Sequence, residues 1–372
     1  MGAEAENLVF ASDHTCEETG REALGRPVAV LGVGRGGVRL LEDVHRRNDT
    51  FGLGFLALDT TCPDRTKSSL RDRVPLYRAG KDGFRLFLSC VDVTKALQEH
   101  GAAIEEGMRD SRLVIILACL GDLAEGYLSV HVAGIARATG ALAVVFAVMP
   151  SELEGSIRTG LAADDLRSLS EKAHTVIAVS SDLVYNWSCR GWSSEVIRLA
   201  IEAVSHPFAG PSANLLRVRP PDLWRHFSCG GIGALDVHKG YASGLQRLLG
   251  ETIRGRALRG RSRLWVHIEV GPAICCDDVL IALRTMCETA GPEADVVCSV
   301  VADPTVADGW VKVAVIGSGG LLPPTQRKPE ASDAFGGWVS EAVAEERAQQ
   351  LLEKVLLAQA ERYRKEGYVL VP

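Results

Sequence analysis

A glycine-rich stretch, Gly32-Val33-Gly34-Arg35-Gly36-Gly37, is the first place where this chain could do chemistry. It follows the apolar run Pro27–Leu31 and precedes a segment with helical spacing, Val38–Val44. A glycine turn lets backbone N–H groups approach a phosphate, and the start of a helix favours negative charge. The pattern therefore predicts either a phosphate-binding turn or a tight link from a strand to a helix.

The same glycines also match a dinucleotide fingerprint. Gly32, Gly34 and Gly37 have the spacing G-x-G-x-x-G, and Asp59 lies at the end of the next apolar run. An acid at that place holds a ribose hydroxyl in dinucleotide-binding proteins. This interpretation predicts an NAD-dependent oxidoreductase, which also needs a general acid or base downstream, and no convincing one is evident.

Alternating strands and helices must position this turn. Apolar runs that are typical of buried strands alternate with helical segments from Pro27 to about Ser205, which predicts a parallel sheet covered on both faces. The expected strands are Val28–Leu31, Leu53–Leu58, Leu113–Ala118, Leu142–Val148 and Val176–Val179, and the expected helices are Thr94–Met108, Leu128–Thr139, Ser156–His174 and Ser193–Val204.

The second half of the chain predicts a smaller unit. A stretch rich in Pro and Gly, His206–Pro221, indicates a boundary, and Leu223–Leu249 is expected to be helical in part. Strand, helix and two strands then follow, at Leu264–Val270, Asp277–Thr289, Val296–Val301 and Trp310–Ile316. We therefore expect an α/β protein with a Rossmann-like domain at residues 27–205 and a smaller α+β domain at residues 206–320.

The two ends of the chain have a different character. Residues 1–26 are polar and acidic and are expected to form a disordered extension, and residues 321–338 read as a linker. Residues 339–372 predict an amphipathic C-terminal helix with an apolar stripe. Such a stripe packs on its own protein, or it engages a partner or a membrane surface.

Composition limits the classes of function. The chain has 372 residues, 47% of them hydrophobic, and a formal net charge of −6, which gives no reason to expect nucleic acid as a partner. The ten cysteines include no Cys-x-x-Cys pair, so we expect no metal site. No secretory signal and no apolar run of membrane-spanning length is evident, and we expect a cytoplasmic protein.

Several segments, in their order along the chain, resemble the tubulin/FtsZ superfamily, and FtsZ, the bacterial cell-division GTPase, in particular. The resemblance implies a GTPase domain that ends in a long central helix, here Ser193–Val204, followed by a second domain. It is carried by Val28–Gly37, Leu56–Thr60, Gly140–Pro150 with Glu154-Gly155, Ile177–Asp182 and Val311–Gly320.

The resemblance also assigns roles to single residues. It implies that Glu154 and Arg158 contact the ribose and base side of a nucleotide and that Glu195 reads guanine. Arg39 stands where the family usually has Asn, and Asp182 ends a strand on the nucleotide side. The implied nucleotide-binding set is completed by Gly32, Gly34, Gly36, Gly37, Asp59, Gly121 and Gly126.

The second phosphate loop departs from the family. In place of a run that resembles Gly-Gly-Gly-Thr-Gly-Thr-Gly, the chain has Cys119–Tyr127, in which Gly121 and Gly126 remain and Ala124 replaces Thr. Asp122 and Glu125 bring carboxylates to the expected place of a triphosphate. Two like charges about 4 Å apart repel by on the order of 4 kcal/mol in a surface-like dielectric, so we expect GTP or GDP to bind weakly. Mg²⁺ is expected only with a bound nucleotide.

The loop that resembles the family's catalytic loop, Arg217–Asp222, is altered as well. Arg217 replaces an Asn and Arg219 replaces an acid, and Asp222 remains as the one catalytic candidate. A carboxylate polarises water, whereas an arginine does not. Asp222 is also a good N-cap for a helix that starts at Leu223.

Three function classes follow. We prefer an FtsZ-like protein with weakened or lost GTP binding and hydrolysis. Such a protein acts through contacts with itself or with another FtsZ-like or division-type protein, and reaches a membrane only indirectly or through its C-terminal helix. The alternative is an active GTPase that forms filaments, and the third is an NAD-dependent oxidoreductase.

Overall fold

The structure is a computed structural model of the full chain. It describes residues 27–46, 52–60, 70, 72–76, 90–184, 192–208, 214–228, 231–254, 258, 261–271, 276–290 and 294–319. The predicted extension at residues 1–26, linker at 321–338 and C-terminal helix at 339–372 lie outside the described residues. In the part of the chain that is described, no helix is long and apolar enough to cross a membrane.

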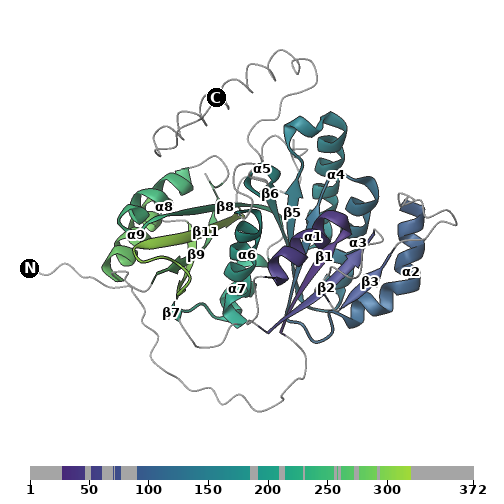
Figure 1. The fold of residues 1–372 in the computed structure, drawn as a ribbon, viewed down its shortest axis with the longest axis horizontal. Helices are drawn as coiled ribbons and strands as arrows, with labels where there is room; N and C mark the ends of the chain where they lie inside the picture. Colours follow the sequence, from purple (N-terminus) through teal and green to yellow (C-terminus); the bar gives the residue numbers. More distant parts are fainter. Residues whose placement is uncertain are drawn as a thin grey trace, which may run out of the picture.

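The described residues build one mixed sheet with helices on both sides (Figure 1). Its strands lie in the order β3-β2-β1-β4-β5-β6-β8-β11-β9-β10-β7. The strands are β1 Val28–Val33, β2 Leu53–Asp59, β3 Arg73–Pro75, β4 Leu113–Cys119, β5 Leu142–Met149, β6 Thr175–Ser180, β7 Asn214–Leu216, β8 Ile232–Tyr241, β9 Arg263–Val270, β10 Asp295–Ala302 and β11 Trp310–Ser318. The helices are α1 Gly34–His45, α2 Cys90–Glu106, α3 Leu123–Ala138, α4 Ser156–Lys172, α5 Ser181–Val184, α6 Trp192–Ser205, α7 Pro220–Phe227, α8 Leu245–Arg254 and α9 Cys276–Ala290.

The first half is the predicted parallel sheet, buried on both faces. Strands β1 and β5 are buried at every residue, as their continuous apolar sequences predict. Alternate residues of β1 enter different cores: Val28 and Val30 pack with α1 and α6, whereas Leu31 and Val33 pack with α2, α3 and α4. This burial on both faces fixes the positions of the loops at the strand ends.

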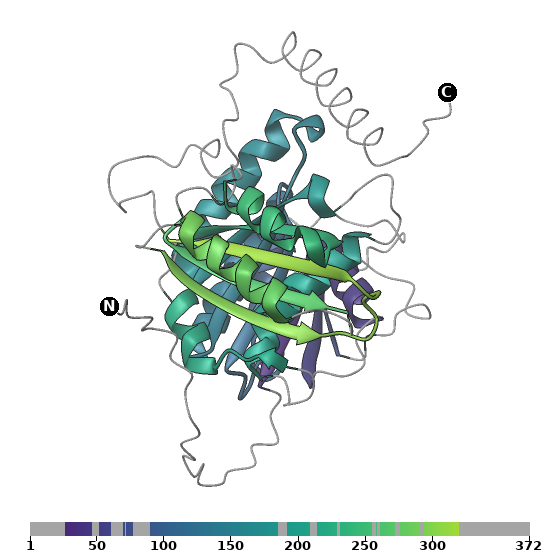
Figure 2. The same cartoon turned by 90° about the vertical axis from the view of Figure 1, so that its left-hand side faces the viewer.

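The second half continues the same sheet. Strand β8 pairs in parallel with β6, with Ile177 opposite Gly233, and β11 runs antiparallel between β8 and β9. Helices α8 and α9 lie across one face of these strands, and Figure 2 shows them in front of the yellow-green strands. Helix α6 contacts both halves, and on the second half the Trp265 indole N–H donates to the Ala203 carbonyl at 2.7 Å.

The prediction that Leu223–Leu249 is helical in part is confirmed by α7 and α8. Strand β8, at residues 232–241 between them, was not predicted, and in it Gly233 lies so close to the Gly317 carbonyl that a Cβ would be 2.7 Å from its oxygen. The predicted start of one helix was wrong. Helix α3 begins at Leu123, five residues before the expected start at Leu128. The reason is Asp122, whose side chain caps this helix.

Candidate functional site

The candidate site lies where neighbouring parallel strands end. Strands β1 and β4 pair in register from Val28↔Leu113 to Val33↔Ala118, so the glycine turn after β1 and the loop after β4 meet at one edge of the sheet. Helix α1 starts at Gly34 and helix α3 at Leu123, with their N-termini at this edge. Two helix starts side by side form a place that favours an anion.

Close packing explains the glycines of the first turn without any ligand. A Cβ on Gly32 would lie 2.6 Å from the Gly37 carbonyl oxygen, and one on Gly36 would lie 2.6 Å from the Cys119 side chain. A Cβ on Gly37 would collide with the Leu117 carbonyl oxygen. These three glycines let α1 pack tightly against β1 and β4, so their presence alone does not indicate a bound phosphate.

Glu125 occupies the anion position of the first turn. Its Oε1 accepts a hydrogen bond from the Arg35 amide at 2.7 Å and from the Thr60 hydroxyl at 3.0 Å, and the Gly36 amide also bonds to the carboxylate. Gly34 has a φ of +70°, and a Cβ there would lie 2.6 Å from the Glu125 carboxyl carbon. A carboxylate of the chain itself therefore takes the backbone donors that a phosphate would use.

Asp122 takes the donors of the second helix start. Its Oδ1 accepts from the amides of Ala124 at 3.1 Å and Glu125 at 3.2 Å. The preceding Gly121 has a φ of +96°, and a Cβ there would lie 3.0 Å from the Arg158 carbonyl oxygen. The expected phosphate loop is thus a short turn followed by a capped helix, with Gly126 inside the helix and not in the loop.

A third carboxylate, Asp165 of α4, lies against this helix start. A Cβ on Gly126 would collide with the Asp165 carboxylate, and Oδ2 of Asp165 has no hydrogen-bond partner among the described residues. Burial raises the pKa of Asp165 to about 6, against the lowering effect of the Gly121 amide and with help from Asp164 and Asp122. Burial also raises the pKa of Glu125, more than its hydrogen bonds lower it.

Other predicted residues at this edge have protein partners. Asp59 is buried, and its Oδ2 binds Arg73 Nη1 at 2.6 Å, while the same guanidinium also binds Glu42. The expected ribose-binding carboxylate of a dinucleotide site thus joins β2 to β3. Arg39 lies on the exposed face of α1.

The predicted ribose-side pair, Glu154 and Arg158, is brought together. The two side chains form an ion pair at 3.2 Å, and Glu154 also accepts from the Ser151 amide at 2.9 Å. They lie after β5, next to the Gly121 turn. Asp182 lies in α5, and its side chain is outside the described residues.

Glu195 does not join this group. It lies in the first turn of α6, where both carboxylate oxygens are engaged: Oε2 by Arg198 Nε at 3.1 Å, and Oε1 by Arg198 Nη2 at 2.9 Å and Lys312 Nζ at 2.7 Å. Burial favours a raised pKa, but the hydrogen bonds from Arg198 and Lys312 outweigh it and lower the pKa of Glu195. Its predicted role in reading guanine stays a prediction.

Asp222 lies at the opposite edge of the sheet. The Thr175 hydroxyl, at the start of β6, donates to the carbonyl of Phe227, the last residue of α7, at 2.5 Å, which places α7 beside the amino ends of the strands. The prediction that Asp222 is the N-cap was wrong, because Arg219 is the N-cap of α7. Asp222 lies three residues later, and its Oδ2 accepts a hydrogen bond from the Arg219 amide at 3.4 Å. The Arg219 side chain is 74% exposed.

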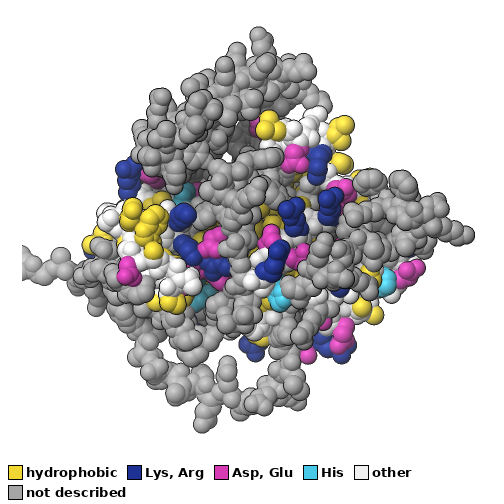
Figure 3. Space-filling view, viewed as in Figure 1, with side chains coloured by type: hydrophobic (Ala, Val, Ile, Leu, Met, Phe, Trp, Pro, Cys, Tyr) yellow, Lys and Arg dark blue, Asp and Glu magenta, His cyan; other side chains and the backbone are white. Residues whose placement is uncertain are grey.

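Sequence reasoning missed Asp165 and a second cluster of charges. Glu195, Arg198 and Glu202 on α6 meet Glu269 of β9 and Lys312 of β11. The signal for the cluster was the spacing of the three charges at steps of three and four on an otherwise apolar helix, which puts them on one face. Among the described residues that are visible in Figure 3, basic and acidic side chains are intermingled.

The largely parallel sheet, the glycine turns at its carboxyl edge and the helix packed against both halves define a Rossmann-like α/β fold. No family model matches the chain. The cell-division protein FtsZ of Aquifex aeolicus is 21% identical over 303 residues, which cover 78% of this chain and 82% of that protein.

Solved structures agree with this result. A variant of FtsZ from M. jannaschii has a TM-score of 0.69 and 16% identity, over 79% of this chain and 91% of that one. CetZ2 of Haloferax volcanii, solved as a protofilament with bound GTPγS, has a TM-score of 0.62 and 18% identity, over 88% of this chain and 99% of that one. The chain therefore has the fold of FtsZ and CetZ and resembles FtsZ in sequence over most of its length, as the sequence predicted.

Proposed function

We propose that this chain is an FtsZ-like protein with weakened or lost binding of GTP and GDP, which acts through contacts with other proteins. One observation carries the proposal: the Glu125 carboxylate lies on the amides of the first glycine turn. The protein has its own anion where a nucleotide phosphate would bind. Hydrolysis is then slow or absent, and Mg²⁺ is needed only if a nucleotide binds.

Displacing Glu125 is energetically unfavourable for a phosphate. The incoming group would have to replace hydrogen bonds to a charged carboxylate, each worth about 1.5–3 kcal/mol. It would also bring further negative charge toward Asp122 and Asp165, and the charge of Asp122 already contributes to the raised pKa of Asp165. The remaining donors at the second helix start are taken by Asp122.

Two exposed apolar sites support a function in protein contacts. Leu153 and Ile157 are 77% and 79% exposed at the carboxyl edge, and Trp224 is 43% exposed beside the amino edge. The CetZ2 neighbour was solved as a protofilament. We propose that the partner is a second copy of this chain or another FtsZ-like protein, in the cytoplasm, with a role in division or membrane remodelling by analogy.

Nucleotide titration of the purified chain tests the proposal. We expect millimolar GTP or GDP with Mg²⁺ to leave the melting temperature unchanged, because a ligand that binds the folded state must raise it. The double variant Ala124→Thr/Glu125→Gly frees the turn amides and should bind nucleotide more tightly. Glu152→Gln, which removes an exposed acid from the same edge, is the matched control and should bind no better than the parent chain.

The alternative, an active filament-forming GTPase, has one observation in its favour: Glu154 and Arg158 are paired beside the second turn. It predicts micromolar GTP affinity and turnover per molecule that rises with protein concentration. Either result with the unmodified chain would overturn the proposal. The dinucleotide interpretation gains nothing from Asp59, whose carboxylate binds Arg73.

A further inference from the structure

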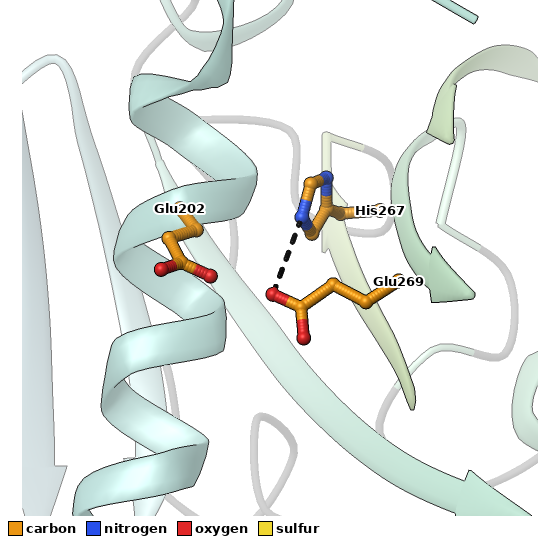
Figure 4. A group of neighbouring side chains, drawn as sticks. All are labelled: Glu202, His267 and Glu269. Carbon is orange, nitrogen blue, oxygen red and sulfur yellow. Dashed lines mark ion pairs between the residues drawn. The ribbon is translucent and has the colours of Figure 1, made fainter. Parts of the chain in front are cut away.

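A cluster of buried ligand atoms lies far from the glycine turns, in the seam between α6 and β9. Glu202 comes from α6, and His267 and Glu269 come from β9, two residues apart and therefore on one face of the strand. Figure 4 shows the two carboxylates and the imidazole turned toward a common space. One ligand atom from each residue lies within 4.8 Å of the others.

We propose that Glu202, His267 and Glu269 bind a divalent transition-metal ion such as Zn²⁺. Imidazole nitrogen and carboxylate oxygen are ligands that zinc prefers, at about 2.0–2.2 Å. Sites with three protein ligands complete the coordination with water. The ion would join the central helix to the second half of the sheet.

The imidazole of His267 is held in a fixed orientation beside the two carboxylates. Its Nδ1 lies 2.8 Å from the Ser299 hydroxyl, which orients the ring. Nε2 lies 4.0 Å from Glu269 Oε1, and two ligands of a tetrahedral ion lie roughly 3.4 Å apart for bonds of the usual length. A small side-chain shift is enough.

The charges around the cluster are unbalanced without a cation. Four carboxylates, those of Glu195, Glu202, Glu269 and Asp303, share two cations, Arg198 and Lys312. A divalent ion beside Glu202 and Glu269 brings the sum of these charges to zero.

Arg198 can stay in place beside a metal ion bound to Glu202, His267 and Glu269. Its guanidinium binds Glu269 at 2.9 and 3.1 Å, contacts Glu202, and also holds Glu195. A carboxylate offers about four lone-pair sites, so one carboxylate can bind a metal and an arginine together. Hydrogen bonds from residues that do not bind the metal themselves orient its ligands. His206 adds a second observation: its ring centroid lies 5.4 Å from that of His267, and its buried Nε2 has no partner among the described residues.

Residues 202, 267 and 269 have no regular metal-ligand spacing, so this site could not be predicted from the sequence. The expectation of no metal rested on the cysteines. Because those thiols also bind zinc, the test uses Co²⁺ as the probe. Its absorption spectrum distinguishes nitrogen and oxygen ligands from thiolates.

The test is a Co²⁺ titration of the full chain after treatment with a chelator. We expect one equivalent to bind at micromolar concentration, with d–d bands, without thiolate charge-transfer bands from that equivalent, and with a higher melting temperature. Glu202→Gln keeps a hydrogen bond to Glu269 and should fold, yet weaken cobalt binding at least tenfold. His267→Gln should do the same, and Glu251→Gln, on the exposed face of α8, should change nothing.

Two results would overturn the proposal. One is the absence of cobalt binding to the unmodified chain at micromolar concentration. The other is an unchanged affinity and spectrum in folded Glu202→Gln and His267→Gln. Neither result depends on nucleotide, so the metal proposal and the proposed function stand or fall separately.

Discussion

The carboxyl edge of the sheet and the seam beside α6 both contain buried carboxylates, but they hold them in different ways. At the edge, Glu125 and Asp122 are held by backbone amides and a hydroxyl. In the seam, Glu195 and Glu269 are held by Arg198 and Lys312. Neutral dipoles hold the first group, and full positive charges hold the second.

The pKa values follow this difference. At the edge, burial outweighs the hydrogen bonds, and the pKa values of Glu125 and Asp165 are raised. In the seam burial acts in the same direction, but Glu202 and Arg198 outweigh it and hold the pKa of Glu269 well below its usual value. Arg198 and its neighbours thus lower the pKa values of Glu195 and Glu269, whereas Glu202, which shares the same arginine but lies against Glu269, has a raised pKa.

Removing Arg198, the cation shared by the carboxylates of the seam, should have the largest effect on stability. Arg198→Met leaves Glu195, Glu202 and Glu269 with one cation, Lys312, and we expect a loss of about 3–5 kcal/mol in the free energy of unfolding. Chemical denaturation at neutral pH measures it. Arg247→Met removes an exposed pair with Glu251 on α8 and should leave the midpoint unchanged. A similar midpoint for both variants would contradict the importance of the seam.

Neutral isosteres test the two regions against each other. Glu269→Gln removes a charge that the seam stabilises and should lower the free energy of unfolding by about 1.5–3 kcal/mol at pH 7. Glu125→Gln removes a charge that burial disfavours, and the change should stay below about 1 kcal/mol. Denaturation of both variants in one buffer checks this. Equal losses would mean that amides and cations hold carboxylates alike.

Packing at the edge is tested by a pair of glycines. Gly126→Ala places a methyl group against the Asp165 carboxylate and should destabilise the protein by about 1–3 kcal/mol. Gly160→Ala, in the exposed interior of α4 with open space around it, should stabilise by about 0.5–1 kcal/mol. Thermal unfolding of both variants gives the comparison. A stabilising Gly126→Ala would show that Asp165 moves aside freely.

The smallest expected effect is a pH dependence from Asp165. Its pKa is raised to about 6 in the folded chain, so its protonated form favours folding. This contribution is fully present below the ordinary pKa near 3.8 and is lost as the pH rises through about 6. Asp165→Asn should therefore be more stable than the parent chain at pH 7 and equal to it near pH 4. Denaturation at both pH values checks the sign.

Much of the fold could be predicted from the sequence. The runs at Val28, Leu113 and Leu142 became buried strands because continuous apolar residues fit a sheet that is covered on both faces. Strand β8 was missed because its outer half, from His238 to Tyr241, is partly exposed and polar and lacks that signal. Its place depends on pairing with β11, which is distant in sequence.

The site was predicted only in part. Asp122 and Glu125 were recognised as carboxylates at a phosphate position, but the contact of Glu125 with the Arg35 amide, 90 residues away, depends on how β1 and β4 pair. Asp165 had no signal, because α4 brings it to Gly126 only in the folded chain. Distances between segments decide these contacts, and a single sequence does not contain them.

The pairing of β6 with β8 has a mechanical consequence. Three residue pairs join the halves of the sheet there, from Val176↔Ile232 to Ala178↔Ala234, whereas eight pairs join β8 to β11. A force that pulls the halves apart therefore meets few hydrogen bonds in the sheet. Resistance comes instead from α6, which is bound on its second-half side by the Trp265 hydrogen bond and by Arg198. We therefore expect α6 to contribute more than the β6–β8 pairing to holding the two halves of the sheet together.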